Sequence, residues 1–175
     1  MASVRIDADL LIPGRGAPLP DASVVMEGVR ISYVGPTASA PDADSTVTVP
    51  TVMPGIWECH GHFLGLNDAD VLPGSLNTPL AERAARATRD MGTFLDAGIT
   101  SVREPGGLGI DLRHAVEDGS VAGPSIYSAG QILSTTGGHA DVHAYPIDFV
   151  ADHPHALGAI CDGVAECLKA CLLYT

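Results

Sequence analysis

From about Thr51 onward the sequence alternates between short β-prone runs and longer amphipathic runs, and this order limits the folds that the chain can adopt. Strands that alternate with helices are typical of parallel βαβ units. Thr78 and Pro79 are predicted to begin the first helix as its N-cap and first-turn proline, and Gly98 to end it. The predicted elements are strands over 52–59, 99–103 and 125–130, helices over 80–97 and 108–118, a long loop over 135–155 and a last helix that opens near Asp162. We therefore expect an α/β fold.

The first fifty residues have a different pattern. Short β-prone runs are separated by clusters of Gly, Pro and Asp, and a tight turn is expected near Glu27 and Gly28. The predicted strands cover 4–12, 22–27, 29–34 and 46–49. We expect residues 1–51 to form a small antiparallel β unit, separate from the parallel βα units of residues 52–175.

Composition narrows the possible functions. The 175-residue chain is 46% hydrophobic and 17% charged, which is typical of a globular protein. A formal net charge of −12 with only nine Lys and Arg residues argues against a nucleic-acid partner and against an anionic membrane surface. No apolar run is long enough to span a bilayer, and no signal peptide is evident, so we expect a cytoplasmic protein. The four cysteines have no paired CxxC spacing and are expected to be reduced thiols.

His60 and His62 are the strongest chemical signal, in the segment MPGIWECHGHF. If this segment is a strand, the two imidazoles point the same way and can bind one metal ion, while Cys59 and Gly61 face the opposite side. Glu58 would lie on the histidine face and could support the ligands from the second coordination shell, although an ordinary charge at a strand end is the alternative. Two polar residues on a half-exposed strand are the alternative for the histidines, but the apolar strand before them favours a metal site.

Two later segments also contain candidate residues. Arg103 and Glu104 end a predicted strand just before a Gly-rich turn, where α/β proteins concentrate functional residues, and a surface ion pair is an equally good interpretation. Arg103 is a candidate for substrate binding. In the segment STTGGHAD, two glycines allow a ligand to approach the backbone, and His139 is a second candidate for substrate binding. A plain flexible loop is the alternative there.

Three further histidines could be read as additional metal ligands. They are His143, His153 and His155, in the same long stretch. Because their spacing matches no compact metal-binding motif, we interpret them as solvated loop residues.

Four segments together resemble a known family. VMPGIWECHGHF, GITSVREPGG, GPSIYSAGQILSTTGGHADVH and CDGVAECLKA occur in this order and resemble the N-terminal part of metal-dependent amidohydrolases. Within that superfamily the similarity is greatest to the imidazolonepropionase-like and prolidase-like branch. It covers nearly the whole chain, and the Pro-Gly-x-x-x-x-His-x-His segment is its specific part.

The resemblance implies the N-terminal part of a (β/α)₈ TIM-like barrel, preceded by a portion of a small β-sandwich. It implies that His60 and His62 bind zinc or a similar divalent ion, with a second metal in the complete enzyme. The implied activity is hydrolysis of carbon–nitrogen bonds in a small amide, cyclic amide or dipeptide by a metal-activated water, and the complete enzyme could be a homo-oligomer. Glu58 and Glu104 depart from the family pattern, in which an aspartate is usual at both places.

The chain is short for a whole barrel, which needs about 250 residues by itself. We expect about three barrel strands here, without the lysine, the two later histidines and the aspartate that complete the family's metal site. Lys169 lies in the last predicted helix and is not assigned the bridging role. Residues 171–175 form an apolar end that suggests a truncated frame whose last residues are not native. We therefore expect weak metal binding and little hydrolase activity from this chain alone.

Two other functions stay open from the sequence. The chain could be a non-enzymatic binding or interaction module that needs a partner to cover its open barrel. It could also be a metallohydrolase on a different scaffold, which the order of strands and helices disfavours.

Overall fold

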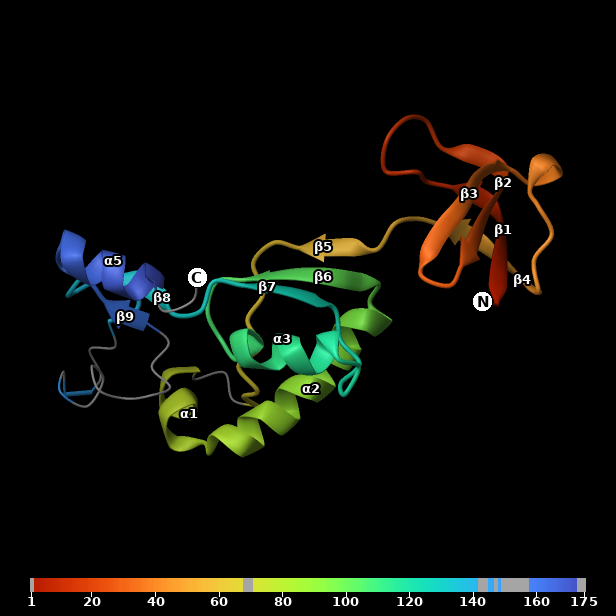
Figure 1. The fold of residues 1–175 in the computed structure, drawn as a ribbon. Helices are drawn as coiled ribbons and strands as arrows, with labels where there is room; N and C mark the ends of the chain where they lie inside the picture. Colours follow the sequence, from red (N-terminus) through yellow and green to blue (C-terminus); the bar gives the residue numbers. More distant parts are fainter. Residues whose placement is uncertain (1, 68–70, 142–144, 147, 149–157, 173–175) are drawn as a thin grey trace. The chain divides into compact units, whose positions relative to one another are not determined.

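The computed structural model describes residues 2–67, 71–141, 145–146, 148 and 158–172 (Figure 1). Within this part the chain divides into two compact units, residues 1–54 and 55–175, each with its own sheet. We describe each unit by itself.

The first unit is a four-stranded sheet in the order β3-β2-β1-β4. Its strands are β1 (Ser3–Leu11), β2 (Leu19–Glu27), β3 (Arg30–Pro36) and β4 (Ser45–Val52). The tight turn predicted at Gly28 joins β2 to β3, and Gly28 has a φ of 61°. The predicted antiparallel pairing is present between β1 and β2 and between β2 and β3, whereas β1 pairs with β4 in parallel. The chain reaches that parallel position by passing through the short helix η1 (Thr37–Ser39), which lets β4 enter on the far side of β1.

The second unit is built on three parallel strands in the order β5-β6-β7. The strands are β5 (Ile56–Glu58), β6 (Ile99–Glu104) and β7 (Ser125–Ser128). Helices α1 (Val71–Asn77) and α2 (Leu80–Asp96) connect β5 to β6, and helix α3 (Gly109–Glu117) connects β6 to β7. This is the βα alternation that the sequence predicts. In the described residues it forms an open sheet rather than a closed barrel.

Helices α2 and α3 cover one face of this sheet (Figure 1). The apolar residues between the helices and the sheet form one core, whose buried members are Phe63, Ala87, Met91, Val102, Leu108 and Ile126. Ala87 and Met91 are fully buried and lie four positions apart on α2, as the predicted apolar stripe requires. This core packs the helices against the sheet and so holds β5, β6 and β7 in place.

The start of α2 differs from the prediction in two ways. Pro79 rather than Thr78 is the N-cap, and no side chain caps this end. Arg83 is not on the solvent side with the other arginines of the helix, since its side chain is only 1% exposed. Its guanidinium donates hydrogen bonds to the carbonyls of Leu64 and Ser75, at 3.0 and 2.9 Å, and so joins the loop after β5 to α1 and α2. Burial lowers the pKa of this guanidinium.

The opposite face of the sheet is exposed in the described part of the chain. Trp57 on β5 and Tyr127 on β7 are 53% and 56% exposed, and their rings lie 4.9 Å apart between centroids. Arg103 is in register with Tyr127 on this face. Side chains on the two faces of a strand alternate, so Val102 and Glu104 point to the helices while Arg103 points away from them.

Three elements were not predicted. Helix α1 occupies a stretch to which we assigned no helix or strand from the sequence, and it includes Pro73 and Gly74. Strands β8 (Ile132–Ser134) and β9 (Gly158–Ile160) pair in parallel as a separate two-stranded sheet. The last helix, α5 (Val164–Leu172), follows β9 and begins two residues after the predicted position. None of the helices in the described residues is long and apolar enough to cross a membrane.

Candidate metal site

His60 and His62 lie just beyond the carboxyl end of β5, and not within a strand as predicted. The predicted strand over 52–59 is interrupted at 53–55, so only Ile56–Glu58 pairs with β6. Pro54 contributes to this interruption because proline has no N–H to donate to a sheet. The two imidazoles are nevertheless close together and exposed, with ring centroids 5.1 Å apart and the rings nearly perpendicular. The structure therefore brings together the pair that the sequence selected.

The ring of His62 is held by the backbone of the loop after β6. Its Nδ1 lies 2.6 Å from the carbonyl oxygen of Gly106. A carbonyl can only accept, so Nδ1 must carry the proton, and in the neutral ring the lone pair is then on Nε2. A histidine whose Nδ1–H is fixed by a carbonyl is the usual arrangement of a metal ligand that binds through Nε2.

His60 has a different environment. A terminal nitrogen of Arg103 lies 3.5 Å from its Nδ1, at the limit of a hydrogen bond. The same guanidinium donates from Nε to the carbonyl of Cys59 at 2.5 Å, which fixes the backbone before His60. Arg103, predicted to bind substrate, is thus exposed at this site and contacts the segment that contains the histidines.

Glu58 does not lie on the histidine side, and this part of the prediction is wrong. It is in register with Val102, which faces the helices, and its Cγ is 3.4 Å from the position that a Cβ on Gly61 would take. Strict alternation would place Glu58 with the histidines, but the chain leaves the strand after Glu58 and the alternation stops there. Its carboxylate accepts the backbone N–H of His60 at 2.8 Å rather than a ring N–H.

Glu104 is not part of a surface ion pair, because it is completely buried. One carboxylate oxygen accepts the backbone N–H groups of Phe63 and Gly109 at 3.0 and 3.1 Å, and the other accepts the hydroxyl of Ser128 at 2.9 Å. These donors come from the loop after β5, the first turn of α3 and the end of β7. Glu104 therefore joins three segments at the carboxyl edge of the sheet, a role that the sequence did not reveal.

The Gly106–Gly107 turn is shaped around this carboxylate. The two glycines have φ values of 143° and 145°, which L side chains rarely adopt. A Cβ on Gly107 or on Gly109 would overlap the carboxylate oxygens of Glu104. Gly107 and Gly109 therefore allow the backbone to lie directly against the Glu104 side chain.

The segment of residues 134–141 is folded on itself. The N–H of Ala140 bonds the hydroxyl of Ser134 at 3.2 Å, and a Cβ on Gly138 would overlap that hydroxyl. His139 is exposed, and within the described part of the chain no hydrogen bond joins its imidazole to the two candidate ligands. Its role in substrate binding stays a prediction. His143, His153 and His155 lie outside the described residues.

Asp162 ties this segment to the start of α5, and the tie is expected to depend on pH. Its carboxylate accepts both the N–H and the hydroxyl of Thr136, and these two bonds lower the pKa of Asp162. Because the folded pKa is below the unfolded one, the stabilisation is complete above about pH 4 and is lost as the pH falls through the folded value. We expect the Asp162→Asn variant to be less stable than the wild type at pH 7. The urea-unfolding midpoints of the two proteins should converge as the pH is lowered below about 4, and a difference that does not change with pH would contradict the assignment.

The two imidazoles fit a divalent metal of the zinc type. Neutral imidazole nitrogen is a ligand that zinc and its neighbours prefer, and the hydrogen bond from His62 to Gly106 leaves Nε2 available. Among the described residues no group of three or more His, Cys, Asp or Glu side chains is placed to hold a metal ion. His60 and His62 are thus two candidate ligands, and the described residues offer no third one beside them.

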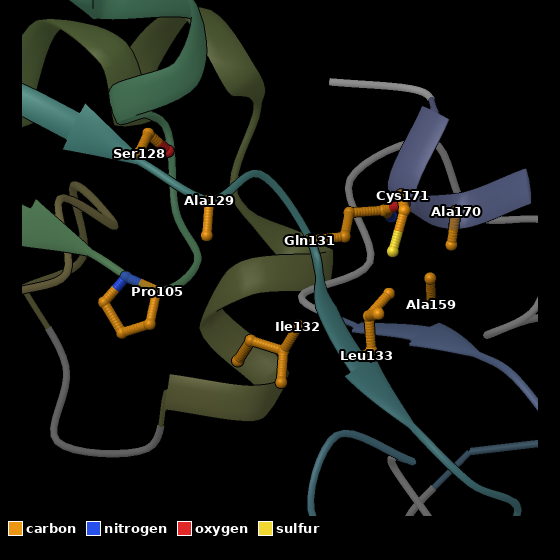
Figure 2. Close-up of a pocket in the computed structure, with 9 residues that line it drawn as sticks. All are labelled: Pro105, Ser128, Ala129, Gln131, Ile132, Leu133, Ala159, Ala170 and Cys171. Atoms are coloured by element: carbon orange, nitrogen blue, oxygen red, sulfur yellow. The ribbon is translucent and has the colours of Figure 1, made fainter. Parts of the chain in front are cut away.

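A cavity of about 510 Å³ lies beyond the ends of β6 and β7 (Figure 2). Figure 2 shows Pro105, Ala129 and Ile132 on one side of it and Ala170 of α5 on the other. The lining is mostly apolar, with Ser128 and Gln131 as its polar members. Neither His60 nor His62 is among the described residues that line the cavity, and Cys171 is the one lining thiol among them.

Comparison with known proteins places the chain in one superfamily. No family model matches the sequence. Ochratoxinase from Aspergillus niger is 39% identical over 183 aligned residues, which cover 94% of this chain and 38% of that protein. Its crystal structure superposes with a TM-score of 0.90 at 36% identity, over 99% of this chain and 44% of the other.

Two further relatives belong to the same group. A prolidase crystallised with N-methylphosphonate-L-proline superposes with a TM-score of 0.81 at 30% identity, over 98% of this chain and 43% of the other. Imidazolonepropionase from Cutibacterium acnes is 35% identical over 124 aligned residues, which cover 58% of this chain and 31% of that protein. The chain belongs to the amidohydrolase superfamily, as its sequence motifs indicate, and corresponds to the N-terminal part of these relatives. It spans about two fifths of the length of the ochratoxinase that it matches.

Proposed function

We propose that this chain supplies the N-terminal βα units and two metal ligands of a metal-dependent hydrolase that cleaves carbon–nitrogen bonds. The relatives named ochratoxinase, imidazolonepropionase and prolidase are hydrolases, which supports the class of reaction. The observation that carries the proposal is the pair of adjacent imidazoles at the carboxyl edge of a parallel sheet, one of them fixed as the Nδ1–H tautomer. The carboxyl edge is where α/β barrels place their active sites, and we propose that the open sheet is the start of such a barrel.

In this proposal His60 and His62 hold a divalent ion, for which zinc is our first choice, and a second metal is compatible with the complete enzyme. A metal at this position would supply an activated water and polarise a substrate carbonyl. The chain's own residues do the positioning: Gly106 fixes the ring of His62, while Arg103 and Glu58 bond the carbonyl and the N–H of the peptide unit between Cys59 and His60. The substrate in this proposal is a small amide, cyclic amide or dipeptide. The exposed guanidinium of Arg103 is our candidate for binding its polar end.

The metal proposal is tested by removing the ligands one at a time. We expect His60→Ala and His62→Ala each to weaken Zn²⁺ binding by about 10-fold or more, since even outer-shell changes commonly cost 10- to 100-fold. Isothermal titration of metal-free protein with Zn²⁺ measures the change. His114→Ala is the matched control, because His114 is an exposed histidine on α3 that pairs with Glu117. Equal Zn²⁺ affinity in the wild type and both site variants would contradict the proposal.

We expect the 175-residue chain to show no appreciable hydrolase activity by itself. Catalytic zinc usually has three protein ligands and one open position, and two histidines leave the ion short of that number. Incubation of the zinc-loaded protein with model amides and dipeptides, followed by detection of the released amine, measures this. Sustained turnover that His62→Ala abolishes would contradict the expectation and show that the site is complete in this chain.

The same experiments separate the hydrolase from the non-enzymatic alternative. An interaction module that needs a partner to cover its open sheet would bind no metal at the histidines, and both alanine variants would behave like the wild type. Metal binding that depends on His60 and His62 therefore favours the hydrolase proposal.

A further inference from the structure

We propose that Glu104 is a positioning residue that fixes the tautomer and orientation of His62 for metal binding. This inference deepens the proposed function and rests on it for the role of the metal. Its structural part, the control of the His62 ring by Glu104, can be tested without a metal.

The backbone on both sides of His62 is bonded to residues 103–108. The N–H of Gly61 donates to the carbonyl of Arg103 at 3.1 Å, and the N–H of Phe63 donates to the carboxylate of Glu104 at 3.0 Å. The carbonyl of Phe63 in turn accepts the N–H of Leu108 at 3.0 Å. The N–H groups of the residues before and after His62, and the carbonyl of Phe63, thus have their partners in residues 103–108.

The side chain of His62 has its partner in the same short segment. Its Nδ1–H bonds the carbonyl of Gly106, which lies two residues after Glu104. The direction of that carbonyl depends on the turn through Gly106 and Gly107, and Gly107 lies so close to the Glu104 carboxylate that a Cβ would overlap it. The carboxylate therefore contacts both the backbone next to His62 and the turn that bonds its ring.

Glu104 itself has little freedom to move. It is fully buried, and its two oxygens together accept three hydrogen bonds. Buried carboxylates that accept several hydrogen bonds orient the groups around them strongly, because any displacement leaves buried donors unsatisfied. Each donor comes from a different segment, so the carboxylate sets the distance between the loop after β5 and the start of α3.

A purely structural role is the competing explanation. Gly109 is the first residue of α3, so Glu104 also satisfies one of the free N–H groups at that helix N-terminus. If this were its whole role, changing Glu104 would lower stability but leave the ring of His62 and its metal affinity unchanged in the folded protein.

Two conservative substitutions separate hydrogen-bond geometry from charge. In Glu104→Gln the amide oxygen can still accept both backbone N–H groups, and the amide nitrogen can donate to the Ser128 hydroxyl. In Glu104→Asp the charge is kept but the carboxylate retreats by about 1.5 Å, one carbon–carbon bond, from donors already at 3.0 and 3.1 Å. Ser128→Ala is a milder variant that removes one of the three bonds. Met91→Ala is the stability control, because it weakens the same core but removes none of these hydrogen bonds.

The first readout is the His62 tautomer in metal-free full-length chain, measured by long-range ¹H–¹⁵N correlation spectra at a temperature where each variant is folded. We expect the Nδ1–H tautomer in the wild type, in Glu104→Gln and in Met91→Ala. We expect a mixture with the Nε2–H tautomer in Glu104→Asp and a smaller admixture in Ser128→Ala. A wild-type tautomer in folded Glu104→Asp, or in folded Ser128→Ala if the aspartate variant does not fold, would overturn the proposal.

The second readout is Co²⁺ affinity, followed by the visible absorption of the bound ion. We expect Glu104→Asp to bind about 10-fold more weakly, the size of effect typical for outer-shell partners, and Met91→Ala to bind like the wild type. Equal loss in both variants would show that lowered stability alone is responsible and would overturn the positioning role. If the wild type bound no Co²⁺, the proposed metal function would fail, while the tautomer comparison would still decide whether Glu104 controls His62.

Discussion

Replacing Glu104 with alanine is expected to lower the free energy of unfolding of the second unit by about 3–5 kcal/mol. The change removes the acceptor of three hydrogen bonds at once. It leaves the backbone N–H groups of Phe63 and Gly109 without their partner in a buried place, and each such group costs about 1–3 kcal/mol. Since small domains are stable by only about 5–15 kcal/mol, this loss is a large fraction of the total stability.

Urea unfolding followed by tryptophan fluorescence measures this effect. Trp57 is the single tryptophan of the chain and lies on β5, next to the segment that Glu104 holds. Glu117→Ala is the matched control, because Glu117 ends α3 with an exposed side chain. We expect the control to change stability by less than about 0.5 kcal/mol. A loss below about 1 kcal/mol in Glu104→Ala would mean that water replaces the carboxylate, and the account of this site given above would be wrong.

Gly65→Ala is expected to destabilise the second unit by several kcal/mol, comparable to a large cavity in the core. Gly65 has a φ of 62°, and a Cβ built on it would overlap the backbone carbonyl of Arg83. A carbonyl within helix α2 cannot rotate away without breaking the helix hydrogen bonds. The loop after β5 would therefore have to separate from α2, which would also break the bond from Arg83 to the carbonyl of Leu64.

Gly98→Ala is the control that separates the energetic cost of a positive φ from the cost of steric overlap. Gly98 also has a positive φ, 80°, but a Cβ there meets no atom within 4 Å. Its replacement should cost only the conformational penalty, about 1 kcal/mol. Thermal unfolding of both variants by circular dichroism gives the comparison. Similar midpoints for the two would show that the overlap at Gly65 is relieved by a small shift of the loop.

The parts of the fold that the sequence predicted well are those determined by local signals. Helix α2 ends at Asp96 and Gly98 follows it in a left-handed conformation, as the predicted end requires. Helix α3 likewise ends at Glu117 with Gly119 two residues later. Periodic apolar residues and a terminal glycine lie within one short window, so they can be read without knowing the fold.

The wrong predictions concern two features: the pairing of strands that are distant in the sequence, and the residue at which a strand ends. The parallel pairing of β1 with β4 depends on how distant segments meet, which no local pattern encodes. From the alternation of side chains along a strand, we predicted that Glu58, His60 and His62 lie on one side. The two histidine rings do lie close together, but Glu58 lies on the other side, because β5 ends at this residue. The parallel pair of β8 and β9 joins residues that a long intervening stretch separates.

Glu104 shows why buried polar roles are hard to read from sequence. Next to Arg103 it reads as half of an ion pair, yet the two side chains point to opposite faces of β6. Its partners are backbone N–H groups, which every residue except proline possesses and which therefore leave no sequence signal. The run of glycines after it was the one available hint, since closely spaced glycines often mark a tight approach.

The hydrogen bond between His62 and Gly106 joins residues 44 positions apart in the chain. While the polypeptide is being synthesised or refolded, this ligand has no fixed tautomer until β6 has docked beside β5 and the turn after it has closed. An ion that binds through His62 should consequently favour the folded over the unfolded chain, and saturating metal at 100 times its dissociation constant would add about 2.7 kcal/mol of stability. Capture of the proposed metal would in this sense be a late event of folding, and the ion would report that the first two βα units have assembled.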